Sequence, residues 1–164
     1  MAKRKSTKSV DSLAHKPMVL YRASVERIQE AGYCLKGRHW IAAMYLAGLA
    51  VECILQAIAL HHGSPHDARH DLTKWLSKCP LSLQDTLKSK EIAGDWNRVA
   101  TVWYNELRYL SEDGLFGHLR NIGRAKKIKG GREAILKENA KRLVESASAV
   151  HKKGLGIWHR FSTK

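Results

Sequence analysis

Apolar residues recur at three- and four-residue steps along most of the chain, which is the spacing of one face of an α-helix. The first stripe covers residues 17–37, and the second covers residues 38–62, where Gly63 and Pro65 end it. Further stripes follow at residues 71–78, 82–90, 95–110 and 133–153. Because no β-type alternation, hairpin signal or internal repeat appears, the pattern predicts an all-α protein, folded as an antiparallel bundle of four to five helices.

The second stripe is apolar on almost every side from Trp40 to Leu60, with Glu52 and Gln56 as polar interruptions. A helix of this kind lies either at the centre of a bundle or in lipid, and this one is long enough to cross a bilayer. An acid near the middle of a membrane costs about 2.5–3.5 kcal/mol. The many alanines of the stripe suit close packing between helices. We therefore expect a central helix of the bundle, no membrane contact, and an internal polar role for Glu52.

Residues 111–132 interrupt the helical pattern with five glycines and six Lys or Arg, and no acid follows Asp113. A long basic loop is expected here, and loops of this length in compact domains are usually functional or disordered. Lys and Arg neutralise phosphates, and glycines let the backbone approach them. The stretch matches neither the Walker pattern nor GxGxxG, so a dedicated nucleotide cradle is not predicted. The expected phosphate-binding residues are Arg120, Arg124, Lys126, Lys127, Lys129 and Arg132. The alternative is a solvated flexible loop.

The chain has 164 residues, which fits one domain, and a formal net charge of +14 that is unevenly distributed. Residues 11–113 are neutral overall, whereas residues 1–10 carry four bases and no acid, and residues 114–164 carry 13 bases and three acids. We interpret the chain as a basic disordered arm (1–16), a single helical domain (17–153) and a basic tail (154–164). A neutral scaffold with basic extensions predicts a phosphate-rich partner such as nucleic acid.

Three cysteines without a CxxC pair are typical of reduced thiols, so a cytoplasmic location is expected. The basic N-terminus is not followed by a long apolar stretch, so no secretory signal is predicted.

Four histidines and two aspartates fall within residues 61–71, and His66 and His70 have the i, i+4 spacing of metal ligands on a helix. Gly63 and Pro65 interrupt that stretch, and no Cys or further His follows at a zinc-type spacing. No metal and no other cofactor is therefore expected. The preferred role of His70 is to cap or brace the next helix.

Three segments carry a resemblance to a known family: WIAAMYLAGLAVECILQAIAL (40–60), HDL (70–72) and W-x4-RY (103–109). Together, in this order, they resemble the HEPN superfamily, the higher eukaryotes and prokaryotes nucleotide-binding domain, over residues 17–112 and 133–153. The resemblance implies an all-α bundle that usually forms a homodimer. Many members are metal-independent ribonucleases of toxin–antitoxin, CRISPR or other antiviral systems, and others are inactive and bind nucleotides or RNA.

Active members of the family carry an Arg-x4–6-His motif, whose arginine steadies the scissile phosphate while the histidine moves protons. This chain departs from that pattern, because nine residues separate Arg108 from His118 and eight separate Arg142 from His151. We therefore expect a HEPN-like protein that binds RNA or another phosphate-rich ligand without nuclease activity. One alternative is a metal-independent endoribonuclease toxin that uses Arg108 with His118 or His70. Another is an accessory subunit whose basic surface docks an acidic protein partner.

The resemblance also places Arg108 and His70 near the bundle core, so either is an expected partner for Glu52. A buried carboxylate needs such a partner, because an unpaired buried charge costs several kcal/mol. Glu52 is then a structural anchor, or alternatively an acid that orients a catalytic Arg or His. Arg108 is the best candidate for a phosphate-binding or catalytic arginine, and its alternative is an ion pair with Glu52 or Glu112.

Overall fold

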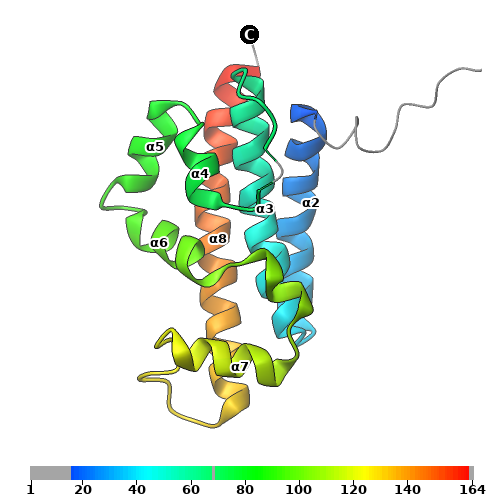
Figure 1. Cartoon of the computed structure of the whole chain (residues 1–164), viewed down its shortest axis with the longest axis vertical. Coiled ribbons are helices and arrows are strands. Elements are labelled where there is room, and N and C mark those ends of the chain that lie inside the picture. Colours follow the sequence, from blue (N-terminus) through cyan, green and yellow to red (C-terminus); the bar gives the residue numbers. More distant parts are fainter. Residues whose placement is uncertain (1–15, 68, 163–164) are drawn as a thin grey trace, which may run out of the picture.

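The computed structural model describes residues 16–67 and 69–162. Three long helices form its body (Figure 1): α2 (Pro17–Lys36), α3 (Trp40–His61) and α8 (Arg132–Ser162). Helices α2 and α3 are antiparallel neighbours, and α3 also packs against α8. Four shorter α-helices and one 3-10 helix lie between α3 and α8 in the chain: α4 (Leu72–Ser77), α5 (Leu81–Lys88), α6 (Ala93–Val102), η1 (Asn105–Tyr109) and α7 (Glu112–Asn121). The described residues contain no strand, and the expected all-α helical bundle is confirmed.

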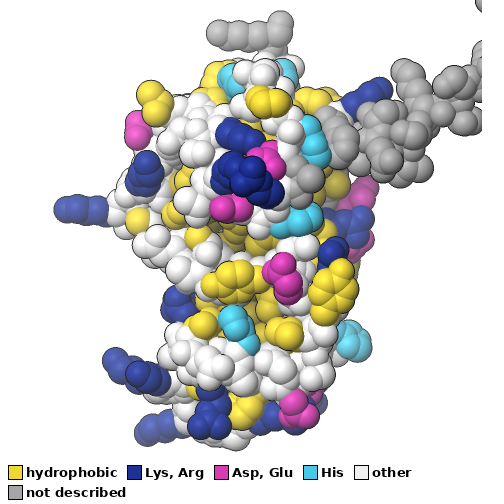
Figure 2. All heavy atoms as spheres, viewed as in Figure 1, with side chains coloured by type: hydrophobic (Ala, Val, Ile, Leu, Met, Phe, Trp, Pro, Cys, Tyr) yellow, Lys and Arg dark blue, Asp and Glu magenta, His cyan; other side chains and the backbone are white. Residues whose placement is uncertain are grey.

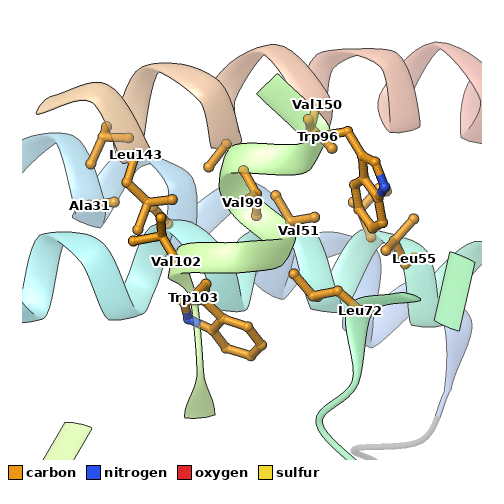
Figure 3. Close-up of a cluster of buried hydrophobic side chains, with 14 of the residues drawn as sticks. Ala31, Val51, Leu55, Leu72, Trp96, Val99, Val102, Trp103, Leu143 and Val150 are labelled. Carbon is orange, nitrogen blue, oxygen red and sulfur yellow. The ribbon is translucent and has the colours of Figure 1, made fainter. Parts of the chain in front are cut away.

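The core is built around α3, which buries 14 of its 22 residues. Its apolar side chains meet α6 and α8, as the close-up in Figure 3 shows for Val51 and Leu55 of α3, Val99 of α6, and Leu143 and Val150 of α8. Among the described residues, α3 is the one helix long and apolar enough to cross a membrane, and most of its apolar window is buried inside the bundle. The all-round apolar pattern is therefore accounted for by neighbouring helices.

The expectation of a loop over residues 111–132 is wrong for its first half, which forms α7. The Ser111 side chain caps this helix by accepting a hydrogen bond from the Gly114 N–H at 3.2 Å, and two acids occupy the first turn. Leu115 and Leu119, one turn apart, are fully buried. Capping and this buried pair outweigh the low helix propensity of the two glycines in the segment.

The expectation of one continuous helix over residues 95–110 is also wrong. Helix α6 ends at Val102, and the backbone of Trp103 and Tyr104 is extended. The Trp103 indole Nε1–H donates to the Tyr45 carbonyl at 3.0 Å. A tertiary contact with α3 therefore overrides the helical spacing at this position.

The predicted basic tail at 154–164 continues α8 as far as Ser162, with Ile157 and Trp158 buried. The predicted disordered arm, apart from Lys16, lies outside the described residues, as do Thr163 and Lys164.

The turn between α2 and α3, the start of α8, and α7 all lie at one end of the molecule, the lower end in Figure 1. We call this region, together with the loop at residues 122–131, the α7 end. All six residues expected to bind phosphate belong to it.

Candidate functional site

One face of α3 carries Tyr45, Gly48 and Glu52, which follow one another at helical spacing. Each is covered by a residue from a later segment of the chain. The Arg108 side chain hydrogen-bonds to Tyr45, and the Trp103 ring packs on Gly48. The His70 ring hydrogen-bonds to Glu52. The face of α3 therefore brings His70 into line with Trp103 and Arg108, which come from a later segment of the chain.

Glu52 is 1% exposed and forms hydrogen bonds to two side chains. The Nδ1 atom of His70 lies 2.9 Å from Oε1 and 3.0 Å from Oε2, and Gln56 Nε2 donates to Oε1 at 2.8 Å. Burial raises the pKa of Glu52, while the hydrogen bond and charge of His70 and the hydrogen bond of Gln56 act in the opposite direction. Of the two partners expected for Glu52, the structure places His70 against the carboxylate.

His70 itself is only partly covered, with 43% of its side chain exposed. When Glu52 is ionised and His70 is neutral, Nδ1–H donates to the carboxylate and Nε2 is left as a hydrogen-bond acceptor. A carboxylate that fixes the tautomer and orientation of an accessible imidazole is the arrangement that general acid–base chemistry requires.

Arg108 is exposed and has no carboxylate partner among the described residues. Its guanidinium lies over the ring of Tyr109, with Cζ 4.7 Å from the ring centroid. A hydrogen bond to the Tyr45 hydroxyl raises the pKa of Arg108 further above its already high value. Both expected ion-pair partners are engaged elsewhere, since Glu52 binds His70 and Glu112 binds Arg132 at 2.9 Å. The charge of Arg108 is therefore available to a ligand.

Arg108 lines a cleft of about 400 Å³ at the start of α3. The His39 N-cap makes no side-chain hydrogen bond to the helix, so the first N–H groups of α3 have no such cap. A helix N-terminus of this kind favours anions. The lining residues are Arg38, His39, Trp40, Ile41, Ala42, Tyr45, Arg108 and Glu112.

Two further clefts, of about 490 and 430 Å³, adjoin the first, because all three share Arg38 and Trp40. They extend the hollowed surface along α8. Within them Arg38 is paired with Glu133. The clefts thus connect the start of α3 to the start of α8 at the α7 end.

The basic side chains predicted to bind phosphate are not equally available. Arg120 lies over the Phe116 ring at 5.7 Å, and Arg124 donates to the Thr101 hydroxyl at 3.0 Å. Arg132 is paired with Glu112 and Asp113. The remaining three are exposed and make no ion pair with the described residues: Lys126, Lys127 and Lys129. Figure 2 shows Lys and Arg side chains gathered at the lower end of the molecule.

The loop that carries them is attached to α8 through Asn139, a residue that the sequence reasoning missed. Its Nδ2 donates to the Arg124 carbonyl at 3.2 Å and to the Ile135 carbonyl at 2.8 Å. Lys127, Gly123 and Gly130 all have positive φ. The loop therefore has a defined turn structure with a buried amide as its anchor.

His118 does not share the cleft of Arg108. It lies on α7 with its ring edge-on to Tyr104, at 5.6 Å between centroids, and lines a separate hollow. No carboxylate of the described residues contacts the His118 ring. Its buried Nε2 atom also has no hydrogen-bond partner among these residues. Of the two histidines proposed for catalysis, only His70 has an orienting acid.

Three of the four histidines of the metal hypothesis lie near aromatic rings, and the fourth, His70, contacts Glu52. His61 lies edge-on to Trp158 and His62 edge-on to Phe161, while Asp67 is bound by Lys74 and Lys78, each at 3.3 Å. Among the described residues, no group of three or more His, Cys, Asp or Glu side chains is placed to hold a metal ion.

The three cysteines are free. Burial raises the pKa of Cys53 and of Cys79 to about 12, so both thiols stay protonated at neutral pH and are poor nucleophiles.

The match to a known family covers most of the chain. The family model for the HEPN domain matches residues 18–157, which include α3, His70, Arg108, α7 and nearly all of α8. No curated protein and no solved structure matches the chain. The family match agrees with the helical bundle, and the chain belongs to the HEPN domain family.

Proposed function

We propose that this protein binds RNA or another phosphate-rich ligand at its α7 end, without cleaving it. HEPN domains are generally associated with nucleotides and RNA, which supports the proposal at the level of the family. The observation that carries it is the presence, at one end of the bundle, of two sets of cations that form no ion pair with the described residues. One is Arg108 in the cleft at the start of α3, and the other comprises Arg120, Arg124, Lys126, Lys127 and Lys129.

This arrangement suits a nucleic-acid backbone. Each Lys or Arg that meets a phosphate releases condensed counterions, which supplies most of non-specific affinity and makes it dependent on salt. The carboxylates near the cleft do not oppose this, because Glu112 and Glu133 are neutralised by Arg132 and Arg38. A phosphate next to Arg108 would also meet the positive end of the α3 dipole.

The test is the fluorescence anisotropy of a labelled single-stranded RNA in EDTA at low salt, with Arg108→Ala beside the wild type. Arg22→Ala is the matched control, because Arg22 is an exposed arginine in the half of α2 away from the α7 end. We expect Arg108→Ala to bind about tenfold more weakly and Arg22→Ala to bind as the wild type does. No binding by the wild type, or equal affinity of Arg108→Ala, would contradict the proposal.

A second candidate function is a metal-independent endoribonuclease, and the Glu52–His70 contact is the observation that favours it. In such a reaction Nε2 of His70 takes the proton of a ribose 2′-hydroxyl, and the freed oxygen attacks the adjacent phosphorus. The bond to the 5′-oxygen breaks, that oxygen takes up a proton from water, and a 2′,3′-cyclic phosphate remains. RNA recovered from the binding assay and run on a denaturing gel distinguishes the two functions. Discrete cleavage by the wild type that is absent in His70→Ala would mean that the protein is an endoribonuclease and not only an RNA-binding protein.

Family membership is the basis for two further proposals, a homodimer and a role in defence or a toxin–antitoxin pair. A cytoplasmic location is proposed from the three cysteines without a CxxC pair. Light scattering after size exclusion measures the first. If RNA neither binds nor is cleaved, capture of one acidic protein by the α7 end would favour the accessory-subunit alternative.

A further inference from the structure

A small apolar hollow lies between η1 and α7. Its volume is about 240 Å³, below the range of roughly 300–1,000 Å³ typical of drug-sized ligands, so it suits one ring system. Tyr104, 45% exposed, and His118 are its aromatic members. The other lining residues are Glu106, Leu107 and Leu110. Figure 2 shows hydrophobic side chains gathered on this face, directly above the Lys and Arg of the α7 end.

A cation is held on the helix α6 that leads into this hollow. The guanidinium of Arg124 donates to the hydroxyl of Thr101, three residues before Tyr104, and Arg124 has no carboxylate partner among the described residues. The loop lysines follow directly in the chain. An aromatic surface beside a row of cations is the arrangement by which proteins bind single-stranded nucleic acid, with bases stacked on rings and phosphates on Lys and Arg.

We propose that this hollow binds one unstacked base of single-stranded RNA, and that it prefers guanine to uracil. The base would stack on Tyr104, and its phosphates would lie on Arg124 and the loop lysines. This inference rests on the proposed function, because it assigns the base-recognition site of the same RNA-binding surface.

The preference follows from Glu106, the one carboxylate among the lining residues. A carboxylate only accepts hydrogen bonds. Guanine offers two adjacent donors, N1–H and the 2-amino group, that match its two oxygens. Uracil offers a single donor, N3–H, which lies between two carbonyl oxygens. The carboxylate repels both of these oxygens. A good bidentate pair of this kind discriminates against the wrong base by about tenfold in affinity, or about 1.4 kcal/mol.

The experiment compares two labelled octanucleotides, all uridine and the same sequence with one central guanosine. We expect the guanosine RNA to bind wild-type protein about tenfold more tightly. Glu106→Gln should remove the preference, and Tyr104→Ala should weaken binding of the guanosine RNA by about tenfold, the usual loss for one stacked base. Tyr33→Ala is the control, because Tyr33 is a 72% exposed tyrosine on α2 that lines none of the clefts described.

Three outcomes separate the claims. Loss of affinity in Tyr104→Ala together with loss of preference in Glu106→Gln supports the base site. Wild-type affinity in Tyr104→Ala, or equal binding of the two RNAs, overturns it while leaving RNA binding intact, and the hollow is then better suited to an apolar side chain of a protein partner. No binding of either RNA overturns this inference and the proposed function together. Thermal unfolding of Tyr104→Ala and Glu106→Gln checks that neither substitution disrupts the fold.

Discussion

The indole ring of Trp103 packs against the α-carbon of Gly48 so closely that a methyl group on Gly48 would lie 2.0 Å from Cγ and Cδ1 of the ring. The same indole donates a hydrogen bond to the Tyr45 carbonyl. These two contacts attach the segment after α6 to α3, and Arg108 follows five residues later beside Tyr45. The position of the candidate phosphate-binding arginine therefore depends on a glycine in the middle of an apolar helix.

Gly48→Ala should destabilise the protein by about 2–3 kcal/mol, because the indole or the helix must move to admit the methyl group. Gly32→Ala on α2 is the matched control, since no atom lies within 4 Å of its added Cβ. That change should stabilise the protein by up to about 1 kcal/mol through helix propensity. Urea unfolding measures both, and equal stability of Gly48→Ala and wild type would show that Trp103 does not pack on the helix as described.

Glu52→Ala should lower the free energy of unfolding by about 1–3 kcal/mol, since His70 and the partly buried Gln56 lose their acceptor. Glu138→Ala removes a surface acid that pairs with Arg142 and should change stability by no more than about 0.5 kcal/mol. Chemical denaturation of the two variants provides the comparison. A Glu52→Ala protein as stable as Glu138→Ala would argue against an anchoring role.

Stability should fall between pH 6.5 and 4 because of His151. Its Nε2–H donates to Ser24 Oγ at 3.0 Å, Ser24 donates in turn to the Tyr21 carbonyl, and burial lowers the pKa of His151 from 6.5 to about 4. As the pH falls through this window the unfolded chain binds a proton before the folded one does. Folding therefore loses up to about 3 kcal/mol, while the full stabilisation is present above pH 6.5.

The check on this prediction is the pH dependence of urea unfolding in His151→Gln beside the wild type. The variant should be less stable at pH 7 and should lose less stability between pH 6.5 and 4. Parallel pH profiles for the two proteins would mean that other groups cause the acid sensitivity.

Replacing Lys126, Lys127 and Lys129 together by Ala should weaken RNA binding and reduce the slope of log affinity against log salt by about 2, since each lysine contributes about 0.7 on a single strand. The control removes the same charge elsewhere, through Lys88, Lys90 and Lys152, which are also exposed. The control should leave the slope nearly unchanged. Equal slopes for both triple variants would mean that the loop makes no specific phosphate contact.

The sequence predicted the first two long helices well, because their boundaries have local causes. Pro17 starts the first, and a glycine at position 37 and the Gly63–Pro65 stretch end the first two, so α2 and α3 lie within one or two residues of the expected ranges. It failed where tertiary contacts decide the local conformation. The Trp103 contact with Gly48 ends α6, and the burial of Leu115 and Leu119 stabilises a glycine-containing α7.

The candidate site was predictable only in part. The sequence singled out Glu52, His70 and Arg108, but whether His70 or Arg108 binds Glu52 depends on the path of the chain over α3. No sequence pattern predicts the cleft at the start of α3, because Arg38 and Tyr45 become neighbours of Arg108 only through folding. Asn139 gave no signal either, since a polar residue on a helical stripe is typical of a solvent-exposed position until its loop partner is known.

The most direct test of RNA binding at the α7 end is to follow backbone amide NMR signals of the ¹⁵N-labelled full chain as single-stranded RNA is added. The account predicts that the largest shifts occur at residues 38–42, near Arg108, and at residues 120–129, with little change in the first half of α2 or in α5. Shifts confined to those distant regions, or no shifts at all, would contradict it.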